Sequence, residues 1–110
     1  MMAKPVRPDA TELLRQMQDG ERTAVSIVEE HLERLEANHT RLNAAVHVFK
    51  EEAMAEAQNP RPGPLSGLPI SIKETIAIAG QSVTAGSKRM PPIQWQEDAE
   101  VVRRLRHAGA

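Results

Sequence analysis

Apolar residues recur at three- and four-residue spacing through the first third of the chain, which is the period of an amphipathic helix. In the segment 9–20 this apolar side comprises Leu13, Leu14 and Met17. In the segment 23–38 it comprises Val25, Val28, Leu32 and Leu35. Asp9 and Thr23 suit the N-cap positions of the two helices, and Gly20 suits the end of the first. We therefore predict a helical hairpin.

The pattern changes after the second predicted helix. Alternation of Ala44, Val46 and Val48 indicates a short strand within 42–49. Residues 50–58 are strong helix formers. The proline-rich segment 59–64 excludes regular structure. We therefore divide the chain into a mostly helical part, 1–59, and a second part, 60–110.

The second part contains the strongest strand candidate, residues 68–72, in which Leu68, Ile70 and Ile72 alternate with other residues. Asp98 is expected to cap a final helix that ends at Gly109. The apolar residues of that helix are Val101, Val102, Leu105 and Ala108.

These elements predict an α/β fold, with the helical hairpin followed by the first strands of a mixed sheet that helices cover. Few strands leave sheet edges unpaired and apolar faces uncovered. Only Phe49 and Trp95 are aromatic among 110 residues, so the side chains that usually bury most area are nearly absent. We therefore expect residues 1–110 to be the truncated N-terminal part of one larger domain, stopping at Ala110 where a further strand should follow.

Composition excludes several classes of function. The net charge of −1 indicates neither a nucleic acid nor an anionic membrane surface as partner. The absence of cysteine excludes disulfides, thiolate zinc sites and cysteine nucleophiles. The N-terminus lacks the apolar stretch of a secretory signal, and no run approaches the roughly 20 apolar residues of a membrane helix. We expect a cytoplasmic protein.

Lys73 poses the chemical question of this sequence, because it lies in the otherwise apolar stretch "GPLSGLPISIKETIAIAG", residues 63–80. A buried ammonium group must be paired or must lose its proton. The simpler interpretation is a lysine at a strand end that extends its amine into water. The residues alone leave both interpretations open.

The other polar clusters favour structural roles. The four histidines lack the spacing of a zinc motif, so they are expected at surfaces or interfaces; they are His31, His39, His47 and His107. The sequence "TAGS", 84–87, lacks the frame of a phosphate-binding loop and is expected to be an ordinary turn. The cluster "RRLRH", 103–107, suits the C-terminal end of a helix.

The ordered motifs around Lys73 resemble the amidase signature family. "GPLSGLPISIKETIAIAGQSVTAGS" matches a Gly-Pro-Leu-x-Gly-hydrophobic-Pro stretch, a strand ending in Ile/Val-Lys-Asp, and a Thr-x-x-Gly-Ser-like segment. "EDAEVVRRLRHAGA" matches the helix that follows, and "RLNAAVHVFKEEAMAEA" matches an earlier Leu-Asn-Ala segment with its helix. The resemblance covers about residues 9–110, and it is specific because the order of the motifs matches.

The resemblance implies that Lys73 belongs to a Ser–cis-Ser–Lys triad. In such a triad an apolar setting lowers the pKa of the lysine, and the neutral amine takes a proton from a bridging serine. That serine deprotonates the nucleophilic serine, which attacks the amide and forms an acyl-enzyme. Two departures matter. Glu74 stands where aspartate is commoner, and nothing matches the segment of the two serines. No role is therefore assigned to Ser66, Ser71, Ser82 or Ser87.

Three functions remain open at this point. The first is an amidase-type hydrolase that cleaves a small-molecule carboxylic amide without a cofactor or metal. The second is a glutamine amidotransferase subunit of the same family, of the kind that supplies ammonia to misacylated tRNA. The third is a non-catalytic remnant whose helical hairpin mediates association, for example in a homo-oligomer. With both serines absent, the 110 residues alone are predicted to be inactive, and neither the amide nor the acyl acceptor is specified.

Overall fold

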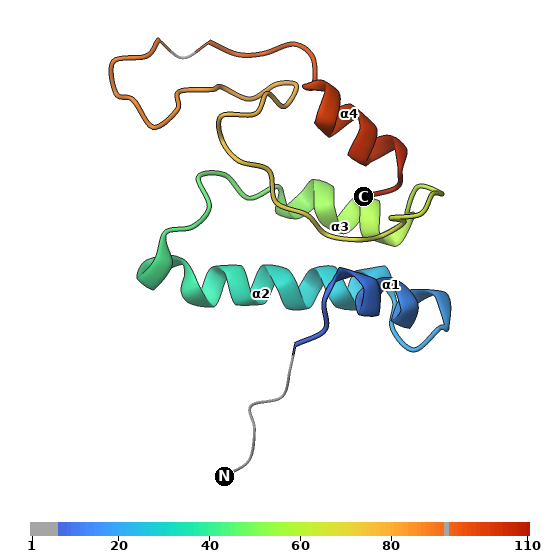
Figure 1. The fold of residues 1–110 in the computed structure, drawn as a ribbon. Helices are drawn as coiled ribbons and strands as arrows, with labels where there is room; N and C mark the ends of the chain where they lie inside the picture. The colour runs from blue at the N-terminus through green and yellow to red at the C-terminus, as the bar shows by residue number, and fades with distance from the viewer. Residues whose placement is uncertain (1–6, 92) are drawn as a thin grey trace.

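The computed structural model describes residues 7–91 and 93–110, which form four helices. Figure 1 shows that α2 and α3 run side by side in opposite directions, with α1 beside the start of α2. Helix α4 and the arm formed by residues 79–91 and 93–95 lie beyond α3, on the side away from α2. The helices are α1 (Ala10–Gln18), α2 (Ala24–Leu42), α3 (Lys50–Gln58) and α4 (Glu100–His107).

The first two helices begin where the sequence predicts. The Asp9 carboxylate accepts the Glu12 N–H at 2.9 Å, and the Thr23 hydroxyl accepts the Ser26 N–H at 3.1 Å. These bonds satisfy N–H groups that have no partner within a helix. Gly20 follows α1 with a φ of +74°, the left-handed conformation that ends many helices. The predicted caps and stop signal are confirmed.

The predicted strand within 42–49 is wrong. Helix α2 extends past its expected end at residue 38 to Leu42, and Asn43 ends it in the left-handed conformation. The rest of this segment is a loop between α2 and α3, in which Val46 is 84% exposed. Alternation predicts a strand only where a neighbouring strand is present to pair with it. The described residues provide none here.

Two small apolar clusters hold the helices together. The first joins Leu13 of α1, Ile27 of α2 and Leu68, and Ile27 is fully buried. The second joins α2 to α3 through Ala24, Val28 and Ala57. Helix α1 therefore contacts the beginning of α2, as the predicted hairpin requires, whereas the longer contact of α2 is with α3.

The expected sheet is not formed by the described residues. Residues 68–72 have no regular secondary structure, and Leu68 is buried against the helices while Ile70 is 44% exposed. Across 7–91 and 93–110, β pairing is limited to an isolated antiparallel bridge between Ser82 and Gln94. A strand is defined by hydrogen bonds to a neighbour, and this segment has no neighbouring strand. The mixed sheet therefore stays a prediction.

The segment after the prolines is fastened to the end of α4 through backbone atoms. The Leu65 N–H donates to the Ala108 carbonyl at 2.8 Å, and the Gly67 N–H donates to the Gly109 carbonyl at 3.1 Å. A Cβ atom at Gly63 would lie 2.2 Å from the Ala108 oxygen, which is closer than atoms can approach. The glycines in "GPLSG" and "HAGA" therefore permit two backbones to meet directly.

Asp98 does not cap α4 as predicted. The N-cap is Ala99, without a side-chain hydrogen bond. The Asp98 carboxylate instead accepts the Ala79 N–H at 2.8 Å and lies 3.1 Å from Nε of Arg106. A carboxylate takes the nearest available donors, and here a distant segment supplies one. Of the predicted apolar residues of α4, Val102 is buried, whereas Val101 is 49% exposed.

We predict that Gly109→Ala destabilises the protein more than Gly20→Ala does. Both glycines have positive φ, so either alanine should lower the free energy of unfolding by about 1 kcal/mol through backbone strain. At Gly109 the new Cβ would also lie 2.8 Å from Cα of Ser66, whereas Gly20 has open space. This overlap should raise the loss to on the order of 3 kcal/mol, measured by urea unfolding of the complete polypeptide. Equal losses would contradict the backbone contact.

Candidate functional site

Lys73 begins a tight turn in which its carbonyl accepts the Ile76 N–H at 2.9 Å. Its side chain is exposed, although Ile72 and Ile76 beside it are partly buried. Within the described part of the chain, the Lys73 ammonium makes no hydrogen bond or ion pair. Of the two interpretations left open by the sequence, the described residues therefore show the one in which the amine extends into water.

Glu74, the next residue, carries the most extensive polar contact in this half of the chain. Its carboxylate accepts the Thr84 N–H at 3.0 Å, the Thr84 hydroxyl at 2.8 Å and the Ala85 N–H at 3.0 Å. The hydroxyl bond and one N–H bond come from the same residue, so Thr84 is held at two atoms. The turn that contains Lys73 is thereby tied to residues 84–87.

The tied loop has the backbone geometry of an anion-binding nest. Ala85 and Gly86 have φ values of +52° and +74°, and the Ser87 N–H closes the turn on the Thr84 carbonyl at 2.9 Å. Successive N–H groups converge in such conformations and favour a negative charge in the concavity. A left-handed alanine costs about 1 kcal/mol, which the bonds to the carboxylate offset. The predicted turn at "TAGS" is confirmed, and its anion is Glu74.

These hydrogen bonds lower the pKa of the Glu74 carboxyl below its ordinary value. The Thr84 hydroxyl has the largest effect, followed by the backbone N–H groups of Thr84 and Ala85. All of them donate to the ionised form, which they stabilise relative to the protonated form. Sequence reasoning assigned no role to Glu74, because no periodicity links an acidic residue to a turn ten positions later.

The arm that carries this loop is closed at its base. The Gly80 N–H donates to the Trp95 carbonyl at 2.7 Å, and the Trp95 N–H donates to the Gln81 carbonyl at 3.1 Å. The Gln94 amide adds a bond to the Gly80 carbonyl at 2.7 Å. The arm is thus joined at its base, and Glu74 holds Thr84 and Ala85 of the arm to the turn of Lys73.

The four serines of this region lie in different surroundings. Ser66 lies beside Gly109, whereas the other three are exposed; they are Ser71, Ser82 and Ser87. Among the residues that the structure describes, no serine hydroxyl hydrogen-bonds to the Lys73 amine. The described chain therefore brings together Lys73, Glu74 and the loop 84–87.

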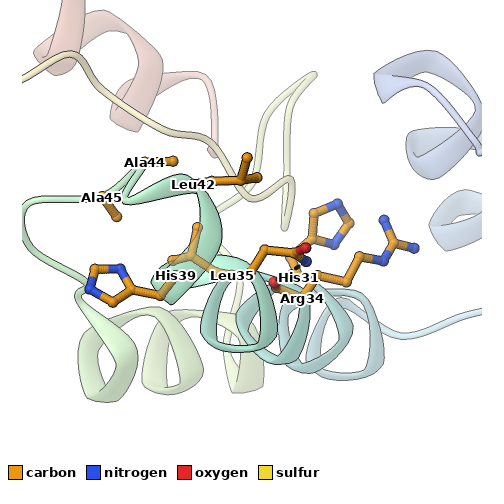
Figure 2. Close-up of a pocket in the computed structure, with 8 residues that line it drawn as sticks. His31, Arg34, Leu35, His39, Leu42, Ala44 and Ala45 are labelled. Atoms are coloured by element: carbon orange, nitrogen blue, oxygen red, sulfur yellow. Dashed lines mark hydrogen bonds between the residues drawn. The ribbon is translucent and has the colours of Figure 1, made fainter.

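A hollow of about 210 Å³ lies apart from this site, at the C-terminal end of α2. Figure 2 shows Leu35 and His39 of α2 on one side of it, with Leu42, Ala44 and Ala45 on the other. Its lining is mostly apolar, and none of its residues comes from the segment around Lys73. It offers a contact surface and no apparent chemistry.

The histidines show local contacts. The His31 ring nitrogen Nδ1 lies 2.7 Å from the Ile27 carbonyl one turn earlier, and His47 packs edge-on against Phe49. Across 7–91 and 93–110, no three histidine or acidic side chains gather as metal ligands would. None of the described helices has both the length and the apolar character to cross a membrane.

Comparison with known proteins identifies relatives that match most of the 110 residues. A family model described as Amidase matches residues 26–110. The chain is 36% identical over 109 residues to a subunit of the glutamyl-tRNA(Gln) amidotransferase of Rhodopirellula baltica, covering 92% of this chain and 22% of that one. It is 42% identical over 103 residues to AmiB2 of Mycobacterium tuberculosis, named as an amidase, covering 87% of this chain and 22% of that one.

A solved structure agrees with these relatives. The crystal structure of an amidase superimposes with a TM-score of 0.79 and 37% identity, covering 94% of this chain and 25% of the solved chain. The described helices and loops therefore have the arrangement of one part of an amidase. The chain spans about a fifth to a quarter of the length of the proteins it matches.

We predict that Glu74→Gln destabilises the protein at neutral pH and has a smaller effect in acid. A carboxylate whose folded pKa is depressed contributes stability above its unfolded value, here 4.5, and loses it as the pH falls through the lower folded pKa. The free energy of unfolding of both proteins, measured in urea at pH 7 and at successively lower pH, should therefore converge in acid. If the difference in free energy of unfolding between the two proteins does not change with pH, Glu74 is not held as an ionised carboxylate by the loop 84–87.

Proposed function

Because the chain belongs to the amidase family, we propose that Lys73 is the lysine of a Ser–cis-Ser–Lys triad in an enzyme that cleaves carboxylic amides. The observation that carries this proposal is the family match over 26–110, which includes the whole stretch around Lys73. Within the described residues the Lys73 amine makes no hydrogen bond or ion pair, so it is available to a partner that lies outside them.

In this proposal the lysine acts as a base through a second residue. Its neutral amine accepts a proton from a bridging serine, which accepts one from the nucleophilic serine. The nucleophile attacks the carbonyl carbon, the C–N bond breaks, and the departing amine leaves with a proton. Water or another acceptor then resolves the acyl-enzyme. Both serines lie outside residues 1–110 in this scheme.

We further propose that residues 1–110 form the N-terminal part of a single α/β domain. Residues 68–72 would then pair with a strand outside this segment, which accounts for the exposure of Ile70. The chain covers only 22% of the length of its relatives, in agreement with this proposal. The intact mass of the polypeptide from its native source tests it. A mass equal to that of these 110 residues would favour the non-catalytic remnant.

A glutamine amidotransferase subunit is the second candidate function. It is favoured by the 36% identity to a chain of a glutamyl-tRNA(Gln) amidotransferase. The identity to AmiB2, which is named as an amidase, is 42%. The hydrolase and the amidotransferase subunit differ in their assembly. The transferase subunit needs a stable partner chain that receives its ammonia. Isolation of the native polypeptide in a tight heteromeric complex would select the transferase. Cytoplasmic location and homo-oligomer formation stay predictions.

We predict that Lys73→Ala and Lys73→Arg both abolish amide hydrolysis by the complete polypeptide. Removal of a positioned base lowers the rate by roughly a hundredfold to ten-thousandfold, and arginine does not yield its proton at working pH. The matched control is Lys88→Ala, since Lys88 is also exposed and lies in the arm. The measurement is ammonia release from a primary amide, compared at equal folded protein. Full activity in Lys73→Ala would refute the assignment.

A further inference from the structure

Lys73 and Glu74 are consecutive residues of one hydrogen-bonded turn, so the position of one restricts the other. The turn is closed by the bond from Ile76 N–H to the Lys73 carbonyl at 2.9 Å. Glu74 then reaches across the chain to Thr84 and Ala85. The backbone of Lys73 is thus connected to the loop 84–87 through a single side chain.

The three donors to Glu74 come from two neighbouring residues and include a hydroxyl, which gives the contact a fixed orientation. The Thr84 hydroxyl donates to Oε2, and the N–H groups of Thr84 and Ala85 donate to Oε1. The same hydroxyl oxygen accepts the Gly86 N–H at 3.3 Å. A loop held only by its own turn could pivot, whereas three donors on one carboxylate resist both rotation and translation.

We propose that Glu74 is a positioning residue that holds the loop 84–87 in a fixed position relative to the turn that contains Lys73. This inference rests on the proposed function of Lys73. Glu74 does not touch the reacting atoms in this account. It fixes the position of the lysine turn relative to the backbone of the loop 84–87. In this way it fixes the orientation in which the Lys73 amine approaches the bridging serine. Small displacements of a catalytic group are costly even when binding is unchanged.

Three variants of the complete polypeptide test the inference. Glu74→Gln keeps the size of the side chain but removes the charge and replaces one acceptor oxygen with an NH₂ group, so the side chain can no longer accept from all three donors at both oxygens. Thr84→Val removes the hydroxyl donor and keeps the backbone N–H. Glu97→Gln is the matched control, because Glu97 is exposed and makes no hydrogen bond or ion pair within the described chain.

We expect Glu74→Gln to lower kcat for amide hydrolysis by roughly ten- to a hundredfold while KM changes little, because positioning affects the reaction more than binding. Thr84→Val should lower kcat in the same direction but less, and Glu97→Gln should match the original protein. Amide hydrogen exchange provides a second measurement. The N–H groups of Thr84 and Ala85 should exchange at least several times faster in Glu74→Gln, with the helices of the protein unaffected.

The outcomes separate this inference from the proposed function. Turnover that depends on Lys73 but is unchanged in Glu74→Gln would overturn the positioning role alone. Slow exchange at Thr84 and Ala85 in Glu74→Gln would overturn the contact on which that role depends. Absence of Lys73-dependent turnover in the original protein would overturn the proposed function and the positioning role with it. If Glu74→Gln does not fold, kcat and amide hydrogen exchange are measured in Thr84→Val instead, and they test the positioning role in the same way.

Discussion

The arrangement of the second half of the chain depends on a direct contact between two backbones. Residues 63–67 and the end of α4 meet through hydrogen bonds from Leu65 and Gly67, with no side chain between them. The same stretch places Leu68 in the cluster with Leu13 and Ile27, so the contact joins α4 to the helical part of the molecule. The described residues between 69 and 107 lie between these two joined ends, and Lys73 is among them.

Carboxylates, rather than a sheet, fasten this segment at further points. Asp98 accepts the Ala79 N–H, and Glu74 accepts donors from Thr84 and Ala85. Each is an ionised acceptor on backbone N–H groups, and such bonds are stronger than those between neutral groups. A segment with very few ladder hydrogen bonds can therefore keep a defined shape. At Glu74 the cost is sensitivity to acid, because protonation below the lowered pKa of its carboxyl removes the charge that strengthens these bonds.

The helices could be predicted from the sequence because the interactions that form them are local. Asp9, Thr23 and Gly20 act within a few residues of their own positions, and the period of three to four needs no knowledge of the rest of the chain. The features that could not be predicted depend instead on interactions that are not local. The strand expected within 42–49, the cap expected of Asp98 and the unforeseen contacts of Glu74 all depend on partners distant in sequence, which no local pattern specifies. The strand expected at 68–72 stays a prediction. Lys73 stood out because it lies in an apolar stretch, but its place in a triad was implied only by the family resemblance.

The backbone contact between 63–67 and the end of α4 also bears on the order of folding. The buried clusters of helices α1 to α3 are built by residues up to 68, so they can assemble once a nascent chain has emerged past that residue. Leu65 and Gly67, in contrast, have no acceptor until Ala108 and Gly109 have been synthesised and the intervening loop has closed. During translation the lysine turn therefore takes its final position later than helices α1 to α3, and a pause between these segments would leave it exposed to proteases or chaperones.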